Sequence, residues 1–167
     1  MNSSVVIMGV AGCGKSSLGA AVASAEGLVL IEGDDYHSDS SREKMRQGVA
    51  LTDTDREGWL ARLAAELKAH PGGQVLTCSA LRRIYRDVLR SAVPGLRFVY
   101  LDISREEAAR RVAARATHFF SSSLVDSQFA TLESPVGEPL VLRVDATDPL
   151  PELQAQVSAW LHNKDAQ

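Results

Sequence analysis

The sequence predicts an α/β protein in which helices cover a parallel β-sheet. Short apolar runs alternate along the chain with amphipathic helical patterns, which is typical of parallel strands joined by crossover helices. The first apolar run leads directly into a glycine-rich stretch that ends in Gly-Lys-Ser, and a helical pattern follows. With 167 residues, of which 45% are apolar and 23% charged, the chain fits a single domain over 1–167.

The five predicted strands are short, continuous apolar runs, which indicates strands buried on both faces. They span 5–8, 28–31, 75–78, 98–101 and 140–144. Apolar residues also recur at helical spacing in four stretches, which begin at Leu18, Leu60, Leu81 and Leu153. The third stretch predicts a core-facing stripe of Leu81, Ile84, Tyr85, Val88 and Leu89, opposite a charged face of Arg82, Arg86 and Arg90.

Positions 9–16 read GVAGCGKS and match the phosphate-binding loop G-x-x-x-x-G-K-S in its required place between a strand and a helix. The glycines let backbone N–H groups point at a phosphate, and the helix dipole adds positive charge. Lys15 is expected to reach the terminal phosphates of ATP, and Ser16 to bind Mg²⁺, with Glu32 as a second candidate through a water. The predicted nucleotide-binding residues are Gly9, Val10, Ala11, Gly12, Cys13, Gly14, Lys15, Ser16, Ser17, Arg111 and Arg115.

Two segments interrupt the alternation, at about 34–60 and 115–138. Ligands bind beyond the carboxyl ends of parallel strands, so we interpret the first segment as the acceptor site and the second as a closing lid. Asp34 is our candidate for the group that holds and activates the acceptor hydroxyl, and Arg115 for a lid cation that closes over the phosphates. The alternative for Asp34 and its neighbour Asp35 is a turn that caps the next helix.

Several polar side chains in these segments suit an acidic, hydroxylated acceptor. Arg56 lies in the first turn of a predicted helix that Thr52 or Asp53 would cap, and the helix dipole disfavours a cation there. This indicates a role such as binding an acid, and Arg82 and Arg83 could bind a carboxylate or phosphate in the same way. His118 and Gln128 are candidates for hydroxyl contacts, whereas a structural hydrogen bond is the simpler interpretation of His37.

The motifs taken together resemble one family. The ordered set MGVAGCGKS, GDDYH, EKMRQG-x-x-L-x-D-x-DR-x-x-WL, CSALRRIYRDVLR, FVYL and HFF-x-x-x-L-x-x-SQF-x-TLE-x-P spans 8–135 and is similar to bacterial gluconokinases of the short, phosphate-loop type. The resemblance implies phosphorylation of D-gluconate by ATP at its 6-hydroxyl. It also implies a three-layer P-loop NTPase fold of the nucleoside-monophosphate-kinase type, with strand order 2-3-1-4-5, a small helical lid and commonly a homodimer.

The resemblance also extends the set of substrate residues. The family's acceptor-activating carboxylate matches Asp34, and its phosphate-contacting lid arginine matches Arg115. Gluconate is an anion with a row of hydroxyls, so the implied contacts come from arginines and from residues that donate and accept hydrogen bonds. They are Asp34, His37, Arg56, Arg82, Arg83, Arg86, His118 and Gln128.

Three other functions are compatible with a phosphate loop in this fold: a kinase for a related hydroxy acid such as shikimate, a nucleotide-binding switch without catalysis, and a kinase of nucleic-acid ends. The blocks around Arg56 and Gln128 do not favour the first, and the set of Lys15, Ser16, Asp34 and Arg115 argues against the second. The net charge of −3 gives no general attraction to nucleic acid or to an anionic membrane, so we expect neither as a partner.

The remaining composition points to a reduced, intracellular protein. The two cysteines, Cys13 and Cys78, show no CxxC spacing and no nearby histidine cluster, which favours free thiols over a zinc site. Because Cys13 lies near a helix N-terminus, we hypothesise that its thiol is reactive and that its modification blocks ATP. No basic segment with a long apolar run precedes the first strand, and we expect a cytoplasmic location.

Overall fold

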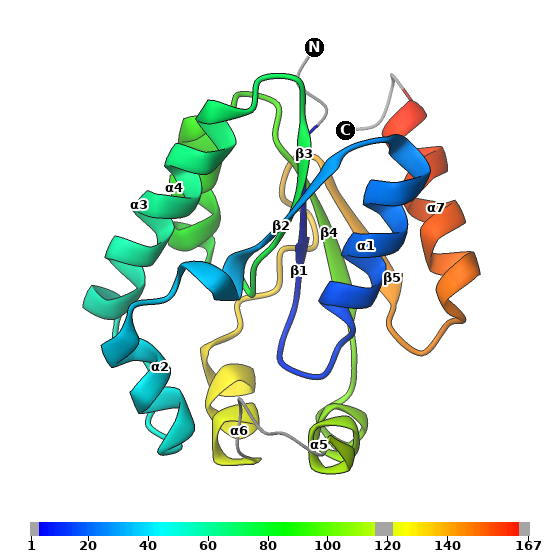
Figure 1. Ribbon diagram of the computed structural model, residues 1–167. Helices are drawn as coiled ribbons and strands as arrows, with labels where there is room; N and C mark the ends of the chain where they lie inside the picture. The colour runs from blue at the N-terminus through cyan, green and yellow to red at the C-terminus, as the bar shows by residue number, and fades with distance from the viewer. Residues whose placement is uncertain (1–3, 116–121, 164–167) are drawn as a thin grey trace.

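A five-stranded parallel sheet of order β2-β3-β1-β4-β5 forms the centre of the computed structural model, which describes residues 4–115 and 122–163 (Figure 1). Every pair of neighbouring strands is parallel. The strands are β1 Val5–Met8, β2 Val29–Glu32, β3 Gln74–Thr77, β4 Arg97–Asp102 and β5 Val141–Asp145. The α/β class, the strand order and all five strands are therefore confirmed.

Helices cover both faces of the sheet (Figure 1). Helices α1 (Lys15–Glu26) and α7 (Leu150–His162) pack on one face, and α3 (Asp53–Ala69) and α4 (Arg83–Ala92) on the other. Successive residues of β1 point to opposite faces, so Val5 and Ile7 join the core under α1 while Val6 and Met8 join the core under α3. This double burial explains why β1 is apolar at every position.

The prediction that the strands are buried on both faces is wrong for the two edges of the sheet. Strands β1 and β3 are buried at every position, but Val29 in β2 is 55% exposed and β5 is only partly covered. The strand order is the reason, since it places β2 and β5 at the edges.

The predicted faces of α4 also need correction. Tyr85 and Leu89 are buried as expected, but Ile84 is 61% exposed. Arg86, predicted to be solvated, is completely buried because Glu138 from the loop that precedes β5 lies against it and neutralises its charge. A charged residue therefore occupies a core position on the face of α4 that the sequence pattern assigned to solvent.

The elements that build the site gather at the carboxyl edge of the sheet, where Figure 1 shows the β1–α1 loop beside α2, α5 and α6. The short η1 (Gly33–Tyr36) and α2 (Asp39–Arg46) follow β2, α5 (Arg105–Ala114) follows β4, and α6 (Ser122–Thr131) precedes β5. Among the described residues, no helix combines the length and apolar character needed to cross a bilayer.

Candidate active site

The β1–α1 loop has the backbone shape of a phosphate cradle. Gly9, Gly12 and Gly14 have φ values of 149°, 84° and 96°, a region in which side chains with a Cβ are strained. Lys15 opens α1 and its Nζ donates hydrogen bonds to the carbonyls of Gly9 at 2.9 Å and Val10 at 3.1 Å. The ammonium is thus held against the loop that the sequence assigned to phosphate.

Arg111 on α5 donates hydrogen bonds to the backbone of this loop. Its Nη1 donates to the carbonyls of Gly12 at 3.3 Å and Cys13 at 3.4 Å, and its Nε donates to Glu107 at 3.0 Å. Its guanidinium therefore bonds the loop backbone, while its contact with nucleotide stays a prediction. The Cys13 side chain is buried in the core, and this burial gives no support to the hypothesis of a reactive thiol.

Ser16 and Glu32 form a hydroxyl–carboxylate pair beside the loop. Ser16 Oγ donates to Glu32 Oε2 at 3.1 Å, and Thr77 Oγ1 at the end of β3 donates to the same oxygen at 2.6 Å. These oxygen ligands fit Mg²⁺, which prefers oxygen and keeps several waters and phosphate oxygens around it. No group of three or more metal-binding side chains occurs in the described ranges.

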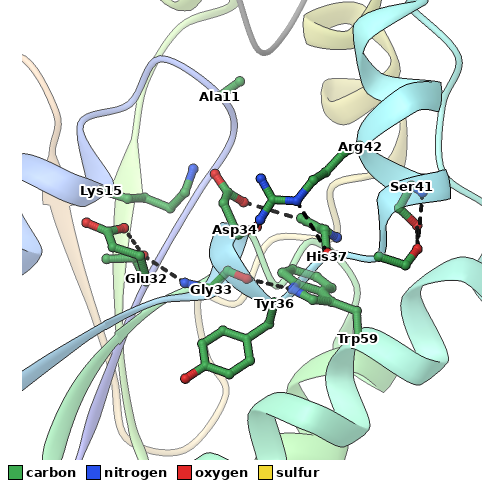
Figure 2. A network of polar contacts seen from close by, with 12 residues as sticks. Ala11, Lys15, Glu32, Gly33, Asp34, Tyr36, His37, Ser41, Arg42 and Trp59 are labelled. Carbon is green, nitrogen blue, oxygen red and sulfur yellow. Dashed lines mark hydrogen bonds and ion pairs between the residues drawn. The ribbon is translucent and has the colours of Figure 1, made fainter.

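The turn after β2 is tightly held. A Cβ on Gly33 would lie 2.2 Å from the carbonyl oxygen of Thr77, so only glycine fits where η1 crosses β3. Three carbonyls of this turn accept hydrogen bonds from α2 and α3, and Figure 2 shows two of the donor residues, Trp59 and Arg42, beside the turn. The pairs are Trp59 Nε1 to Gly33 at 2.8 Å, Arg42 Nη2 to Asp34 at 3.1 Å and Arg62 Nη1 to Tyr36 at 2.6 Å.

Asp34 projects from this turn toward Lys15 (Figure 2). The capping alternative is wrong for α2, because Ser38 is its N-cap and accepts from the backbone N–H of Ser41. Burial of the Asp34 carboxylate acts to raise its pKa, but the His37 contact and the charges of Lys15 and Arg42 outweigh it and lower the pKa. The side chain keeps 55% of its surface exposed, so an ionised carboxylate faces the open site.

Two adjoining cavities meet at Lys15 and Asp34. The first, called here the phosphate cavity, is lined by the phosphate loop, Ser16, Ser17 and Arg115. The second, the acceptor cavity, lies between η1, α2, α3 and α6 and is lined by His37, Arg56, Trp59 and Gln128 among others. Ala11, Lys15 and Asp34 line both cavities, so a phosphate and an acceptor would meet between them.

Known proteins share this architecture and much of the sequence. A family model described as an AAA domain matches residues 5–139. A probable gluconokinase from Schizosaccharomyces pombe is 45% identical over 142 residues, which cover 80% of this chain and 74% of the relative. The chain belongs to the gluconokinase family. A gluconokinase from Gluconobacter oxydans is 44% identical and covers 84% of this chain and 80% of its own.

A solved gluconokinase structure agrees with the family assignment. The protein from Sinorhizobium meliloti 1021 superposes with a TM-score of 0.87 at 45% identity, covering 95% of this chain and 90% of that one. The gluconokinase-family fold therefore extends over nearly the whole chain.

Gln128 connects the two cavities of this gluconokinase-family site. Its Oε1 accepts a hydrogen bond of 2.7 Å from the backbone N–H of Ala11 in the phosphate loop, and its side chain lines the acceptor cavity. The predicted lid thus contributes a buried contact between α6 and the loop. Its C-terminal end is anchored, because Glu138 pairs with Arg86 and Arg90, so the predicted lid range extends into a fixed part of the fold.

The four candidate arginines lie in different environments, and one lines the acceptor cavity. Arg56 is the one that lines the acceptor cavity, and its Nη1 donates to the Tyr85 hydroxyl at 3.2 Å. Within the described residues Arg56 makes no ion pair. Arg82 lines a neighbouring hollow and pairs with Asp53 at 3.1 Å.

The other two arginines are turned away from the cavity. Arg83 has a side chain that is 63% exposed and faces Asp87 at 3.9 Å. Arg86 is buried, and its Nε and Nη2 donate to both carboxylate oxygens of Glu138 at 3.0 and 2.6 Å. Its predicted contact with substrate is therefore corrected to a structural ion pair, because its charge is already neutralised inside the protein.

Of the two candidate histidines, one lies in the part of the chain that the structure describes. His37 lines the acceptor cavity, and its ring stacks on Trp59 with the centroids 4.3 Å apart. His118 lies outside the described residues.

The predicted lid cation, Arg115, is the C-cap residue of α5 and lines the phosphate cavity.

Sequence reasoning missed several residues that shape this site. Trp59, Arg42 and Arg62 hold the turn that carries Asp34, and Glu138 neutralises Arg86. One signal was available: Trp59 is one of only two tryptophans and lies three residues after Arg56, on the same helical face. The partners of Arg62 and Glu138 depend on contacts between distant segments, which no local pattern records.

Proposed function

We propose that this protein transfers the γ-phosphoryl group of ATP to the 6-hydroxyl of D-gluconate, giving 6-phospho-D-gluconate and ADP. The observation that carries the proposal is that Lys15 and Asp34 line both the phosphate cavity and the acceptor cavity. A phosphoryl transfer requires the acceptor hydroxyl to lie in line with the bond that breaks at the γ-phosphate. A cation must hold the phosphates, and a second group must hold the hydroxyl. The names of the relatives supply the identity of the acceptor.

The donor half of the proposal assigns ATP to the phosphate loop. N–H groups of the phosphate loop and the Lys15 ammonium would bind the β- and γ-phosphates, and Arg115 would close over them. Ser16, with Glu32 through a water, would hold the Mg²⁺ of the nucleotide, which neutralises charge on the phosphates when bound. Arg111 would act by fixing the carbonyls of Gly12 and Cys13.

The acceptor half assigns the carboxylate of gluconate to Arg56. Among the four candidate arginines, Arg56 alone lines the acceptor cavity, and among the described residues its guanidinium forms no ion pair within 4 Å. A planar guanidinium suits bidentate recognition of a carboxylate. Asp34 would hold the 6-hydroxyl at the opposite end, and Gln128 would offer its amide to hydroxyls between them.

The lowered pKa of Asp34 defines its role in the proposal. A carboxylate whose pKa is lowered is a weak base, so it would orient the hydroxyl and accept its proton only as the bond to phosphorus forms. Little base strength is needed, because the transition state of phosphoryl transfer is largely dissociative. Orientation and charge neutralisation would then supply most of the catalysis.

A coupled assay of ADP release with MgATP tests this function. The panel of acceptors is D-gluconate, shikimate, other sugar acids and D-glucitol, which is gluconate with its carboxylate replaced by a neutral alcohol. We expect turnover with gluconate, weak turnover with glucitol, and a product whose phosphorus NMR signal couples to the C6 protons. Turnover with another acid and none with gluconate would overturn the proposal.

The family resemblance adds an assembly and a location to the proposal. We include a homodimer, which light scattering of the purified protein tests directly. We also include a cytoplasmic site of action, where ATP and a sugar acid occur together; cell fractionation tests it.

A further inference from the structure

The ring of His37 is buried and fixed in orientation. It is 7% exposed, and it stacks on Trp59 with an interplanar angle of 18°. Trp59 is itself held by its hydrogen bond to the Gly33 carbonyl, and the carbonyl of His37 accepts from Arg42 Nε at 3.4 Å. The imidazole is therefore presented in one plane beside Asp34 (Figure 2).

The two nitrogens of this ring have different surroundings. Nε2 lies 3.6 Å from Asp34 Oδ1. Nδ1 is buried and has no hydrogen-bond partner within the described part of the chain. Buried polar atoms are nearly always hydrogen-bonded, so this nitrogen is suited to a partner that enters the site with the substrate. The ring lines the acceptor cavity, which is where such a partner would come from.

The carboxylate of Asp34 decides which kind of partner fits. An ionised carboxylate only accepts hydrogen bonds, so the His37 tautomer that suits it carries its N–H on Nε2, toward Asp34. Nδ1 is then left with a lone pair and can only accept. The missing partner must therefore donate, as an alcohol hydroxyl does and a carboxylate or ether oxygen cannot.

We propose that His37 Nδ1 accepts a hydrogen bond from the 5-hydroxyl of gluconate, next to the hydroxyl held by Asp34. This inference rests on the proposed function and adds a specificity-determining residue to it. Asp34 Oδ1 lies 3.6 Å from Nε2 of the same ring, and both residues line the acceptor cavity, so we assign to His37 the hydroxyl that follows the 6-hydroxyl along the substrate. The contact would also set the angle at which the 6-hydroxyl faces the phosphate.

Three variants of His37 separate the two nitrogens. His37→Phe keeps the ring on Trp59 and removes both nitrogens. His37→Asn places an amide oxygen near the position of Nδ1, whereas His37→Gln places its amide near Nε2. Thermal unfolding and the KM for ATP measure whether each variant keeps its fold and its nucleotide site.

The experiment compares gluconate with 5-deoxygluconate, and uses 2-deoxygluconate as the matched control. We expect the unmodified protein to prefer gluconate over the 5-deoxy acid by about 10- to 100-fold in kcat/KM, because the analogue leaves Nδ1 unpaired. In His37→Phe and His37→Gln this preference should fall to about one, while His37→Asn retains part of it. The preference over 2-deoxygluconate should stay the same in all variants.

Three results would overturn the inference and leave the proposed function standing, and the first two concern discrimination between substrates. One is a His37→Phe protein that still rejects 5-deoxygluconate as strongly as the unmodified protein, and the other is a loss of discrimination at the 2-position instead. Equal loss of activity toward all three acids would indicate a purely structural ring, which also contradicts it. Failure of the unmodified protein to phosphorylate gluconate would overturn the proposed function as well, so the two failures are distinguishable.

Discussion

Arg86 and Glu138 form a buried ion pair that ties α4 to the loop after α6, with Arg86 Nη2 2.6 Å from Glu138 Oε2. The two side chains are 0% and 6% exposed, and Arg90 donates to the same carboxylate at 2.8 Å. Burial alone would raise the pKa of Glu138, but the hydrogen bonds from Arg86 and Arg90 lower it. The pair holds the C-terminal end of the predicted lid.

Glu138→Ala is expected to destabilise the fold by about 3–5 kcal/mol, since it leaves the charge of Arg86 buried without a partner. Urea unfolding measures the loss. Asp87→Ala, which removes an exposed partner of Arg83 and Arg90, is the control and should change stability by less than about 1 kcal/mol. Equal effects of the two variants would contradict the structural role of the pair.

Arg56→Gln is expected to raise the KM for gluconate by about 10- to 100-fold, because a charge-assisted hydrogen bond to the carboxylate is lost. The KM for ATP should not change, and activity toward neutral glucitol should be nearly unaffected. Arg83→Gln is the matched control, because its side chain is exposed and lies outside the acceptor cavity. A variant that loses gluconate and glucitol activity in parallel would argue against carboxylate binding by Arg56.

Asp34→Asn is expected to reduce kcat by about 10²- to 10⁴-fold while ATP affinity stays roughly intact, since the amide cannot accept the hydroxyl proton. Lys15→Ala should impair ATP binding and turnover together. Steady-state kinetics with both substrates, combined with nucleotide binding by calorimetry, distinguish the two effects. Near-normal turnover of Asp34→Asn would rule out its proposed role.

Gln128→Ala and Gln128→Glu test the contact between α6 and the phosphate loop. Alanine removes the acceptor of the Ala11 N–H, and we expect kcat/KM to fall about 10-fold. Glutamate restores an acceptor but adds a negative charge beside the phosphates, so ATP should bind more weakly than in the alanine variant. If ATP binds equally to both variants, Gln128 does not lie next to the phosphate groups.

Acid should weaken the link between α2 and α3 at Asp55. Lys44 donates to this carboxylate at 2.7 Å, and together with the Thr52 backbone it lowers the pKa of Asp55 to about 2. In the unfolded chain the carboxyl titrates near 3.8, so its contribution is complete above that pH and is lost as pH falls toward 2.

The measurement is the melting temperature between pH 6 and pH 2.5. Asp55→Asn should lower the stability at pH 6 by about 1 kcal/mol, because it weakens the cap of α3 as well as the ion pair. Its melting temperature should also fall less steeply with acid than that of the unmodified protein. Parallel curves would exclude Asp55 as a source of the acid sensitivity.

Local patterns predicted the sheet and the phosphate loop well, because both depend on short stretches of sequence. Buried parallel strands require continuous apolar runs, and the loop at 9–16 requires glycines at fixed spacing before Lys15. The capping box that begins α3 is equally local, since Thr52 and Asp55 bond each other's backbone N–H.

The acceptor side depended on the tertiary structure. The sequence left four arginines as candidates for the substrate carboxylate, and only packing separates Arg56 in the cavity from Arg86 in the core. The sequence by itself determined the fold class, the nucleotide loop and the family, because these follow from residue spacing along the chain. The fold decided which charges are neutralised and which face the substrate, because Glu138, Trp59 and Gln128 reach their partners from distant segments.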